Sequence, residues 1–511
     1  MSASTGDSGL RGGSSKPQCY AGITADLDLE PVLLLRLSLP RPEWMDMDKK
    51  TETSYHDLRP LGPLEQYSVT RSQLGIYLNV CLTAFISRQT AGHLKPRLCR
   101  ALAALILRHP VLSAVPVDLD SQPSRFVRLP TIDLDTVVTV RDVAEDEEFS
   151  LDTALEAQHN EPFVHRPGEL IPFWRVLAFE NGADIALTLC FHHSLFDGKS
   201  AVVFLEDLGV LLSDPSEHTS LAEGVIPTPI YAPLPPALES ILELPLSNAF
   251  VAKQKEEPEV EAHVWSARAQ SLPVRTRFSS LHLSSRASKT IVNQSKQHGV
   301  SVTATLMSCL ASSIFAAIPE EYSTIQGDCA VSLRPFLGPH VTERDMGCWV
   351  AAFSETYHRY PCSEDLLWEN AQRTKATIDK VMRNKGKDTG TGYLRHVSDM
   401  RAWFLQKIGR KRAAAFELSN LGVLAPRTDA ESTNDYEIQG VLFSQSASAC
   451  SGALKVSAVT GRDGRISIGF GWQEGIVEDE LVSSVKENLE ELILFEETTG
   501  DSDRAKVIPV P

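Results

Sequence analysis

The chain has 511 residues, with 49 Lys and Arg against 66 Asp and Glu, so that 49 − 66 gives a net charge of −17. This length allows more than one hydrophobic core, and 42% hydrophobic with 23% charged residues is typical of soluble globular proteins, which excludes a disordered or fibrous chain. The negative charge argues against nucleic acid or an anionic lipid surface as the main partner.

Cysteine usage and the start of the chain point to a reducing compartment. The nine cysteines are scattered, form no Cys-x-x-Cys pair and lie mostly in apolar surroundings, so we expect neither a disulfide framework nor a structural zinc site. The first residues lack the apolar run of a signal peptide, and no stretch reaches the roughly 18 apolar residues of a membrane span. We therefore expect a cytoplasmic protein with no transmembrane segment.

The N-terminal half is predicted to fold after a flexible, polar extension at residues 1–54. Residues 74–86 are β-branched and aromatic, which predicts a buried strand. Apolar residues then recur at helical spacing over 94–106, and His109-Pro110 ends this helix.

A proline-rich segment at residues 213–262 separates the two halves of the chain. Eight of the 30 prolines fall in it, which indicates a long connection rather than a core element. We therefore predict an N-terminal lobe at 55–212 and a C-terminal lobe at 263–498, followed by a tail at 499–511.

The C-terminal half again mixes strands and helices. Ser301 is a predicted cap that starts a buried helix, and a strand at 329–334 ends at a proline. Further strands are predicted at 416–422 and 466–472, and an apolar stripe over 481–492 predicts a terminal helix. Both halves therefore predict an α/β fold built from α+β two-layer lobes.

One stretch carries the chemistry, Phe191-His-His-Ser-Leu-Phe-Asp-Gly-Lys-Ser200. A strand with alternating faces, predicted from Asp184 to His193, runs into two histidines, a turn and a new helix. Such strand ends are where an α/β scaffold presents side chains to a cleft, and histidine is well suited to take a proton near neutral pH. Asp197 can fix the local geometry, and Gly198 permits a backbone angle that a Cβ would resist.

A second interpretation is that the histidines are simply packed, hydrogen-bonded residues at a strand end. Among the 14 histidines only His193 has an Asp four residues on, and the doubled histidine, the glycine and the strand-to-helix context favour catalysis. A metal site is disfavoured, because adjacent strand residues point to opposite faces and no third ligand follows at a useful spacing.

The motif His192-His193-Ser-Leu-Phe-Asp197-Gly198 resembles the HHxxxDG signature of the CoA-dependent acyltransferase superfamily, which includes condensation domains, chloramphenicol and carnitine acyltransferases and plant BAHD enzymes. Within it, the chain over residues 55–495 most resembles the fungal alcohol O-acetyltransferase family, which also contains sphingoid-base N-acetyltransferases. The supporting pieces are Arg59-Pro-Leu-Gly-Pro-Leu-Glu-Gln-Tyr, Arg108-His-Pro-Val-Leu, Pro172-Phe-Trp-Arg, Val331-Ser-Leu-Arg-Pro and Ser419-Asn-Leu-Gly.

The resemblance implies two chloramphenicol-acetyltransferase-like lobes with a channel between them, and His193 as the general base in that channel. CoA enters from one face and the acceptor from the other, so both substrates meet at one base and no acyl-enzyme is required. The resemblance also implies that Asp197 turns away from the imidazole and pairs with an arginine. Arg334 stands at the matching position, and His192 and Gly198 complete the motif.

A hydrogen-bond donor is expected near the oxyanion that develops on the thioester carbonyl. The hydroxyls of Ser444 and Ser446 resemble the serine-rich stretch that carnitine acyltransferases place near this carbonyl, and Asn420 is a further candidate. The more conservative interpretation is that these residues form turns and strand-end hydrogen bonds. We expect no bound cofactor and no metal, with acetyl-CoA or another acyl-CoA as a co-substrate.

The expected function is transfer of an acetyl or short acyl group from acetyl-CoA to a hydroxyl of a small-molecule alcohol or secondary metabolite. Three alternatives stay open: N-acetylation of a sphingoid-base amine, condensation-type transfer from a carrier-protein thioester, and a non-catalytic condensation-like scaffold. We expect a monomer that binds no nucleic acid. Peripheral membrane association stays open, although acidic residues in the helix predicted at 481–492 disfavour anionic headgroups.

Overall fold

The computed structural model describes residues 55–89, 92–119, 124–144, 148–213, 224–256, 261–359, 364–424 and 435–499. These residues all belong to one compact unit, Thr53–Pro511. The extension predicted at 1–54 and the tail from residue 500 onward lie outside the described residues. Helices and strands mix in several sheets, which confirms the predicted α/β class.

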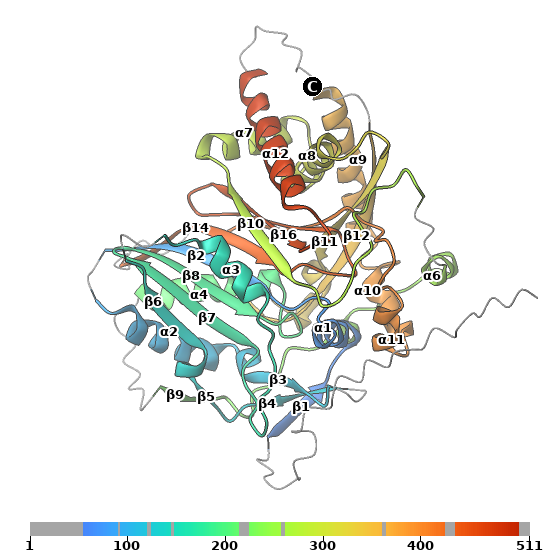
Figure 1. Ribbon diagram of the computed structural model, residues 1–511. Helices are drawn as coiled ribbons and strands as arrows, with labels where there is room; N and C mark the ends of the chain where they lie inside the picture. The colour runs from blue at the N-terminus through green and yellow to red at the C-terminus, as the bar shows by residue number, and fades with distance from the viewer. Residues whose placement is uncertain are drawn as a thin grey trace, which may run out of the picture. The chain divides into compact units, whose positions relative to one another are not determined.

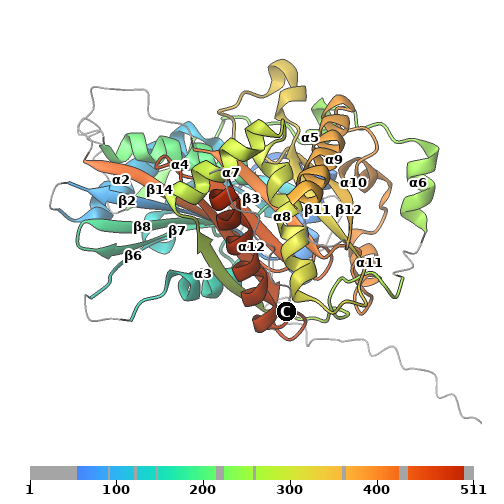
Figure 2. The same cartoon turned by 90° about the horizontal axis from the view of Figure 1, so that it is seen from above.

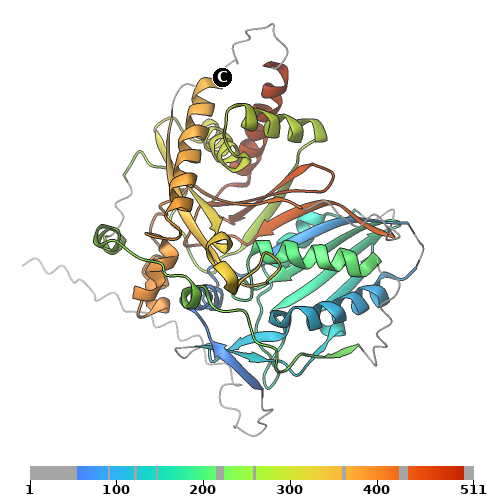
Figure 3. The same cartoon turned by 180° about the vertical axis from the view of Figure 1, so that it is seen from behind.

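The first large sheet has five strands in the order β14-β2-β8-β7-β6 (Figure 1). Neighbouring strands run antiparallel, except for the parallel pair β6 and β7. Helices α2 and α4 lie side by side over one face of this sheet, as Figure 3 shows from behind, whereas α3 lies on the other face. The bounds are β2 Val80–Arg88, α2 Leu94–Arg108, β6 Val138–Asp142, α3 Leu151–His159, β7 Trp174–Asn181, β8 Asp184–Phe191, α4 Gly198–Ser213 and β14 Tyr436–Gln445.

Strand β8 forms as its alternating pattern predicts. Ile185, Leu187 and Leu189 are buried in the first hydrophobic core, which holds the strand in register between β2 and β7. The strand ends at Phe191 rather than at His193, so both histidines lie in the turn that leads to α4.

The second large sheet has six strands in the order β10-β16-β15-β13-β11-β12. Helices α7, α8, α9 and α12 cover one face of it (Figures 1 and 2). The predicted helix after Ser301 is confirmed, since the Ser301 hydroxyl accepts from the amide of Ala304 at 3.2 Å. The bounds are β10 Thr276–His282, α7 Ser285–Gln297, α8 Val302–Ala317, β11 Thr324–Ser332, β12 Val350–His358, α9 Glu364–Arg383, β13 Phe416–Val423, β15 Leu454–Thr460, β16 Ile466–Gln473 and α12 Asp479–Thr499.

Strand β14 links the two halves of the chain. It follows β13 in sequence, yet it pairs antiparallel with β2 along its whole length, with Ser444 opposite Cys81 and Gln445 opposite Val80. The close approach of β14 to the second sheet needs glycine: a Cβ at Gly471 would lie 2.5 Å from the carbonyl oxygen of Gln445. The first sheet is therefore completed by a strand from the far side of the proline-rich segment.

The prediction of a strand at 74–86 is only partly confirmed. Helix α1 (Pro63–Gln73) is followed by a turn, and β2 begins at Val80. Gly75 has a φ of 64°, a left-handed backbone that glycine adopts readily and that interrupts an extended chain. This turn places Tyr77 beside the histidine motif.

The remaining elements are short. Within the connection predicted at 213–262, the described residues form β9, α5 and α6. Separately, seven of the nine cysteines lie among the described residues, and all seven are free thiols. Among the described helices none is long and apolar enough to cross a membrane alone, and the pair α7 and α8, bent by 108°, passes that test on length and composition only. The short elements are β1 His56–Pro60, β3 Ala114–Val117, β4 Arg125–Arg128, β5 Thr131–Asp133, β9 Val225–Pro227, α5 Leu238–Ile241, α6 Asn248–Lys255, α10 Gly390–Tyr393 and α11 Met400–Leu405.

Candidate active site

The turn between β8 and α4 presents the histidine motif. Asp197 directly precedes the helix, and its Oδ1 accepts from the amide and the hydroxyl of Ser200 at 3.0 Å each, which is the pattern of a helix N-cap. Gly198 lacks the unusual backbone angle that we expected, because its φ is outside the left-handed region. A Cβ there would lie 2.5 Å from Cδ2 of Leu421, so the glycine provides close packing instead.

Asp197 and Arg334 form a buried ion pair between the two halves of the chain. Nη1 of Arg334 donates to Oδ2 of Asp197 at 2.7 Å, and the amide of Trp349 donates to the same oxygen at 3.1 Å. Nη2 of Arg334 donates to the hydroxyl of Ser200 at 2.8 Å, and the guanidinium lies 4.8 Å above the ring of Trp349. Burial alone would raise the pKa of Asp197, but Arg334 outweighs it and holds that pKa below its usual range.

The imidazole of His193 is the chemically available group of the motif. It keeps part of its surface exposed, whereas His192 is buried. Nδ1 of His193 lies 3.6 Å from the thiol of Cys348, which leaves Nε2 for a substrate. Burial, followed by the charge of Arg71, lowers the pKa of His193 to about 4, so the ring is neutral at pH 7 and able to accept a proton.

Tyr77 lies close to His193 and to two buried cations, Arg71 and Lys455. Its ring centroid is 6.3 Å from that of His193. The guanidinium carbon of Arg71 lies 4.0 Å and Nζ of Lys455 lies 5.2 Å from the Tyr77 centroid. The phenol donates to Oε1 of Gln445 at 3.1 Å, and burial raises its pKa. Tyr77 is therefore a neutral, fixed wall beside the imidazole.

His192 serves the packing of the turn. Its Nδ1 accepts from the amide of Ser194 at 3.1 Å, and its ring centroid lies 5.2 Å from that of Phe173. Burial, followed by the charge of Arg71, lowers its pKa to about 3. Within this turn the two histidines therefore differ in access: His192 is buried and His193 is partly exposed.

The three oxyanion candidates have different surroundings. Ser444 lies on β14 and its hydroxyl is 2.9 Å from Nε2 of the buried His159. The hydroxyl of Ser446 accepts from the amides of Leu78 and Asn79, directly after Tyr77 in the chain. Asn420 makes its bonds elsewhere: Nδ2 donates to the hydroxyl of Thr303 at 3.1 Å, and Oδ1 accepts from the amide of Gly422 at 2.9 Å. The structure brings Ser446 next to Tyr77, and it engages Asn420 at the start of α8.

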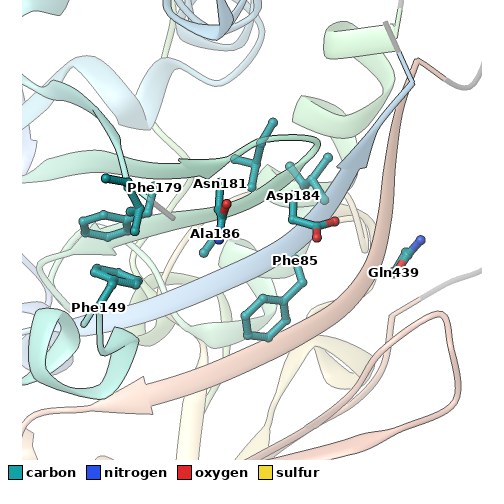
Figure 4. Close-up of a pocket in the computed structure, with 11 residues that line it drawn as sticks. Phe85, Phe149, Phe179, Asn181, Asp184, Ala186 and Gln439 are labelled. Carbon is teal, nitrogen blue, oxygen red and sulfur yellow. The ribbon is translucent and has the colours of Figure 1, made fainter. Parts of the chain in front are cut away.

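A separate cavity of about 440 Å³ lies at the other end of β8. Phe85, Ala186 and Phe179 line it from three neighbouring strands, and Phe149 packs on Phe179 with ring centroids 4.8 Å apart (Figure 4). Its lining contains no residue of the histidine motif. Over the described residues, no group of three or more His, Cys, Asp or Glu side chains is arranged to hold a metal ion.

Several residues of the site were not identified from the sequence. Arg71 lies in the last turn of α1, before Gly75. Tyr77 lies after Gly75, within the segment 74–86 predicted to be a strand. A signal for Lys455 exists, because it is a lone charge within the apolar strand Leu454-Lys-Val-Ser-Ala-Val. Its partner, Glu417, lies opposite it on β13, with Oε2 at 2.6 Å from Nζ.

The chain is similar to known acetyltransferases in sequence and in fold. The family model described as "Alcohol acetyltransferase" matches residues 60–498. A probable alcohol acetyltransferase, crmB of Aspergillus fumigatus, is 29% identical over 456 residues, which cover 84% of this chain and 97% of that protein. The probable alcohol acetyltransferase FCK4 of Fusarium pseudograminearum is 23% identical over 488 residues, covering 86% of this chain and 95% of its own length.

A solved structure shares the fold. The TRI3 trichothecene 15-O-acetyltransferase from Fusarium sporotrichioides superposes with a TM-score of 0.66 at 13% sequence identity, covering 86% of this chain and 94% of that one. At this identity the likeness concerns the fold alone. Together with the family match, it confirms the resemblance that the motif and its flanking pieces indicate.

Proposed function

Because the chain belongs to the alcohol acetyltransferase family, we propose that it transfers an acetyl or short acyl group from acetyl-CoA to a hydroxyl of a small-molecule alcohol, with His193 as the general base. Family membership makes the protein a CoA-dependent acyltransferase. The observation that carries the proposal is the position of His193, which is partly exposed in the turn after β8. Its Nδ1 lies 3.6 Å from the thiol of Cys348, and no hydrogen bond of Nε2 is found among the described residues.

The reaction balances without a further reactant. Nε2 of His193 takes the proton of the acceptor hydroxyl as the oxygen attacks the thioester carbonyl, and a tetrahedral intermediate forms. The C–S bond then breaks, the ester C–O bond remains, and the imidazolium returns the proton to the CoA thiolate. Because both substrates meet at one base, positioning replaces a covalent enzyme intermediate.

The low pKa of His193 fits this role. A base must be unprotonated when the acceptor arrives, and burial together with Arg71 keeps the imidazole neutral at pH 7. The proton is transferred during the attack, so the positive imidazolium forms together with the negative charge of the tetrahedral intermediate, which stabilises it. Asp197 contributes through the shape of the turn, because its oxygens accept from Ser200, Arg334 and Trp349.

For the oxyanion donor we favour Ser446 over Ser444 and Asn420. Its hydroxyl oxygen accepts two backbone hydrogen bonds, from Leu78 and Asn79, which fixes the oxygen and directs the hydroxyl proton elsewhere. The hydroxyl of Ser444 is engaged with His159, and the amide of Asn420 is engaged on both sides.

The test is thiol release from acetyl-CoA by the purified protein over a panel of alcohols. We expect release that depends on the alcohol and that falls by at least 10²-fold in His193→Ala, since general-base catalysis contributes about 10²–10⁴-fold. Release that His193→Ala leaves unchanged would remove His193 as the base. If no alcohol of the panel stimulates thiol release, the result would favour the alternative of a non-catalytic scaffold.

A further inference from the structure

A short segment before β12 is held against the histidine motif by hydrogen bonds on either side of Cys348. The carbonyl oxygen of Gly347 accepts from the amide of Asp197 at 3.1 Å. The amide of Trp349 donates to Oδ2 of the same aspartate at 3.1 Å. The backbone of Cys348 is therefore fixed relative to the turn that carries His193, although the two lie in different halves of the chain.

This arrangement brings the thiol of Cys348 to one particular nitrogen of the imidazole. Sγ lies 3.6 Å from Nδ1 of His193, which is within the reach of a hydrogen bond that involves sulfur. Cys348 is only 3% exposed, so water hardly competes for the contact. A hydrogen bond in such a low-dielectric place is stronger than the same bond in water.

The imidazole is the donor in this contact. A hydrogen bond to the backbone of His193 itself raises the pKa of the ring, against the larger effects of burial and Arg71 that lower it. A partner that raises this pKa stabilises the protonated form, so it is an acceptor. Nδ1 is the ring nitrogen nearer to the residue's own backbone, and we therefore assign the hydrogen of the neutral ring to Nδ1.

The thiol of Cys348 suits the part of an uncharged acceptor. Burial raises its pKa well above the usual range, so the sulfur keeps its proton at pH 7 and carries no charge. A thiol sulfur accepts weakly through its lone pairs. A carboxylate in this place would stabilise the imidazolium and raise the pKa of His193, whereas a neutral sulfur orients the ring without that effect.

We propose that Cys348 is a positioning residue, whose sulfur accepts the Nδ1–H of His193 and holds the imidazole with the Nε2 lone pair toward the acceptor hydroxyl. The proposal rests on the proposed acyl transfer with His193 as the base. Without the sulfur, the ring can rotate about its Cβ–Cγ bond or move its hydrogen to Nε2. Either change removes the lone pair from the position in which it takes the proton.

The first experiment compares two buried cysteines, with acetyl-CoA and an alcohol that supports thiol release. Cys348→Ala should lower kcat about tenfold, the worth of one ordinary hydrogen bond, and leave KM for acetyl-CoA within about threefold. Cys348→Ser should recover most of the lost rate, because a hydroxyl oxygen also accepts from N–H. The matched control is Cys329→Ala, which removes an equally buried thiol from the second core on β11 and should leave kcat within about twofold.

Two kinetic results would overturn the inference. Equal values of kcat in Cys348→Ala and Cys329→Ala would show that the contact with His193 contributes nothing to turnover. A Cys348→Ser variant as slow as Cys348→Ala would show that the volume of the side chain matters and its hydrogen bond does not. Circular dichroism of each variant confirms that the rates are those of folded protein.

The second experiment determines the tautomer without turnover. Nitrogen-15 NMR of histidine-labelled protein at pH 7, with His193→Ala to assign the signals, should show a protonated Nδ1 and an unprotonated Nε2. Both signals should move toward the average of the two tautomers in Cys348→Ala and stay in place in Cys329→Ala. A protonated Nε2 in the unmodified protein, or signals unmoved in Cys348→Ala, would contradict the inference. Failure of the proposed function looks different, because thiol release would then not depend on His193 while the tautomer is measured all the same.

Discussion

Nη1 of Arg334, which follows β11, donates to Oδ2 of Asp197, which caps α4, across 137 residues of sequence and 2.7 Å of space. Both side chains are almost completely buried. The pair therefore ties the turn that carries His193 to the second sheet. Its loss should lower the free energy of unfolding and disturb the position of the His193 imidazole.

Removal of the arginine tests this tie. Arg334→Ala leaves the charge of Asp197 buried without its partner, so we expect a loss of about 3–5 kcal/mol in the free energy of unfolding. Arg344→Ala is the control, because Arg344 is 52% exposed and pairs with Glu206 and Asp207 at the surface, where such pairs contribute at most about 1 kcal/mol. Denaturant unfolding measures both, and equal losses would contradict the prediction.

The pH dependence of catalysis follows from the pKa of His193. The imidazole works as a base only when unprotonated, and its pKa is lowered to about 4, so kcat/KM should hold its plateau at pH 6 and fall only as the pH approaches 4. A pH–rate profile over the range in which circular dichroism reports folded protein measures this. An acid limb near pH 6.5 would mean that the imidazole has an ordinary environment.

Arg71 supplies part of that shift. Its Nε is buried and has no hydrogen-bond partner within the described residues, and its charge is the largest cause after burial of the lowered pKa of His193. Arg71→Gln should therefore move the acid limb of kcat/KM to higher pH, whereas Arg71→Lys should restore part of the shift. A variant that loses activity with an unmoved acid limb would assign Arg71 a purely structural role.

The two serines of β14 and its following turn should behave differently. Ser446→Ala should lower kcat by about 10²-fold, the usual loss when one oxyanion donor is removed, with a smaller change in KM. Ser444→Ala should leave kcat within a few-fold and lower the melting temperature instead, because it removes the partner of His159. Steady-state kinetics and thermal unfolding of both variants measure these effects. An unchanged kcat in Ser446→Ala would exclude the Ser446 hydroxyl as the oxyanion donor.

Buried histidines make the protein sensitive to mild acid. The pKa of His159 and the pKa of His192 are both lowered to about 3 by burial and then by Arg175 and Arg71, respectively. The unfolded chain takes up these protons first, so stability is complete above pH 6.5 and is lost as the pH falls, by about 1.4 kcal/mol per pH unit for each histidine. Urea unfolding at pH 7.5, 6 and 5 measures the slope. His159→Asn should lower the slope of the unfolding free energy against pH by the contribution of one proton.

Local patterns in the sequence predicted the parts of the site that lie close together along the chain. The alternation of Ile185, Leu187 and Leu189 predicted β8, and the HHxxxDG spacing singled out His193. A strand of regular period and a short motif are both determined within about ten residues, where side-chain direction follows from backbone geometry.

The rest of the site depends on pairings between distant segments. Glu417 lies opposite Lys455 only because β13 and β15 adopt one particular register, and no local pattern specifies that register. Tyr77 reaches His193 because Gly75 interrupts what composition alone indicates to be a strand. The pairing of Arg334 with Asp197 came from family resemblance, since no spacing rule joins residues 137 positions apart.

Strand β14 has a consequence for how this chain can be divided. Without it, β2 would become the open edge of the first sheet, with a row of amide and carbonyl groups available to any other extended chain. A gene fragment stopped in the proline-rich segment should therefore yield material that self-associates, and only co-expression with the second fragment should rescue it. Chimeras that combine the N-terminal half of one relative with the C-terminal half of another should keep β2 and β14 from the same relative, because these two strands pair along their whole length.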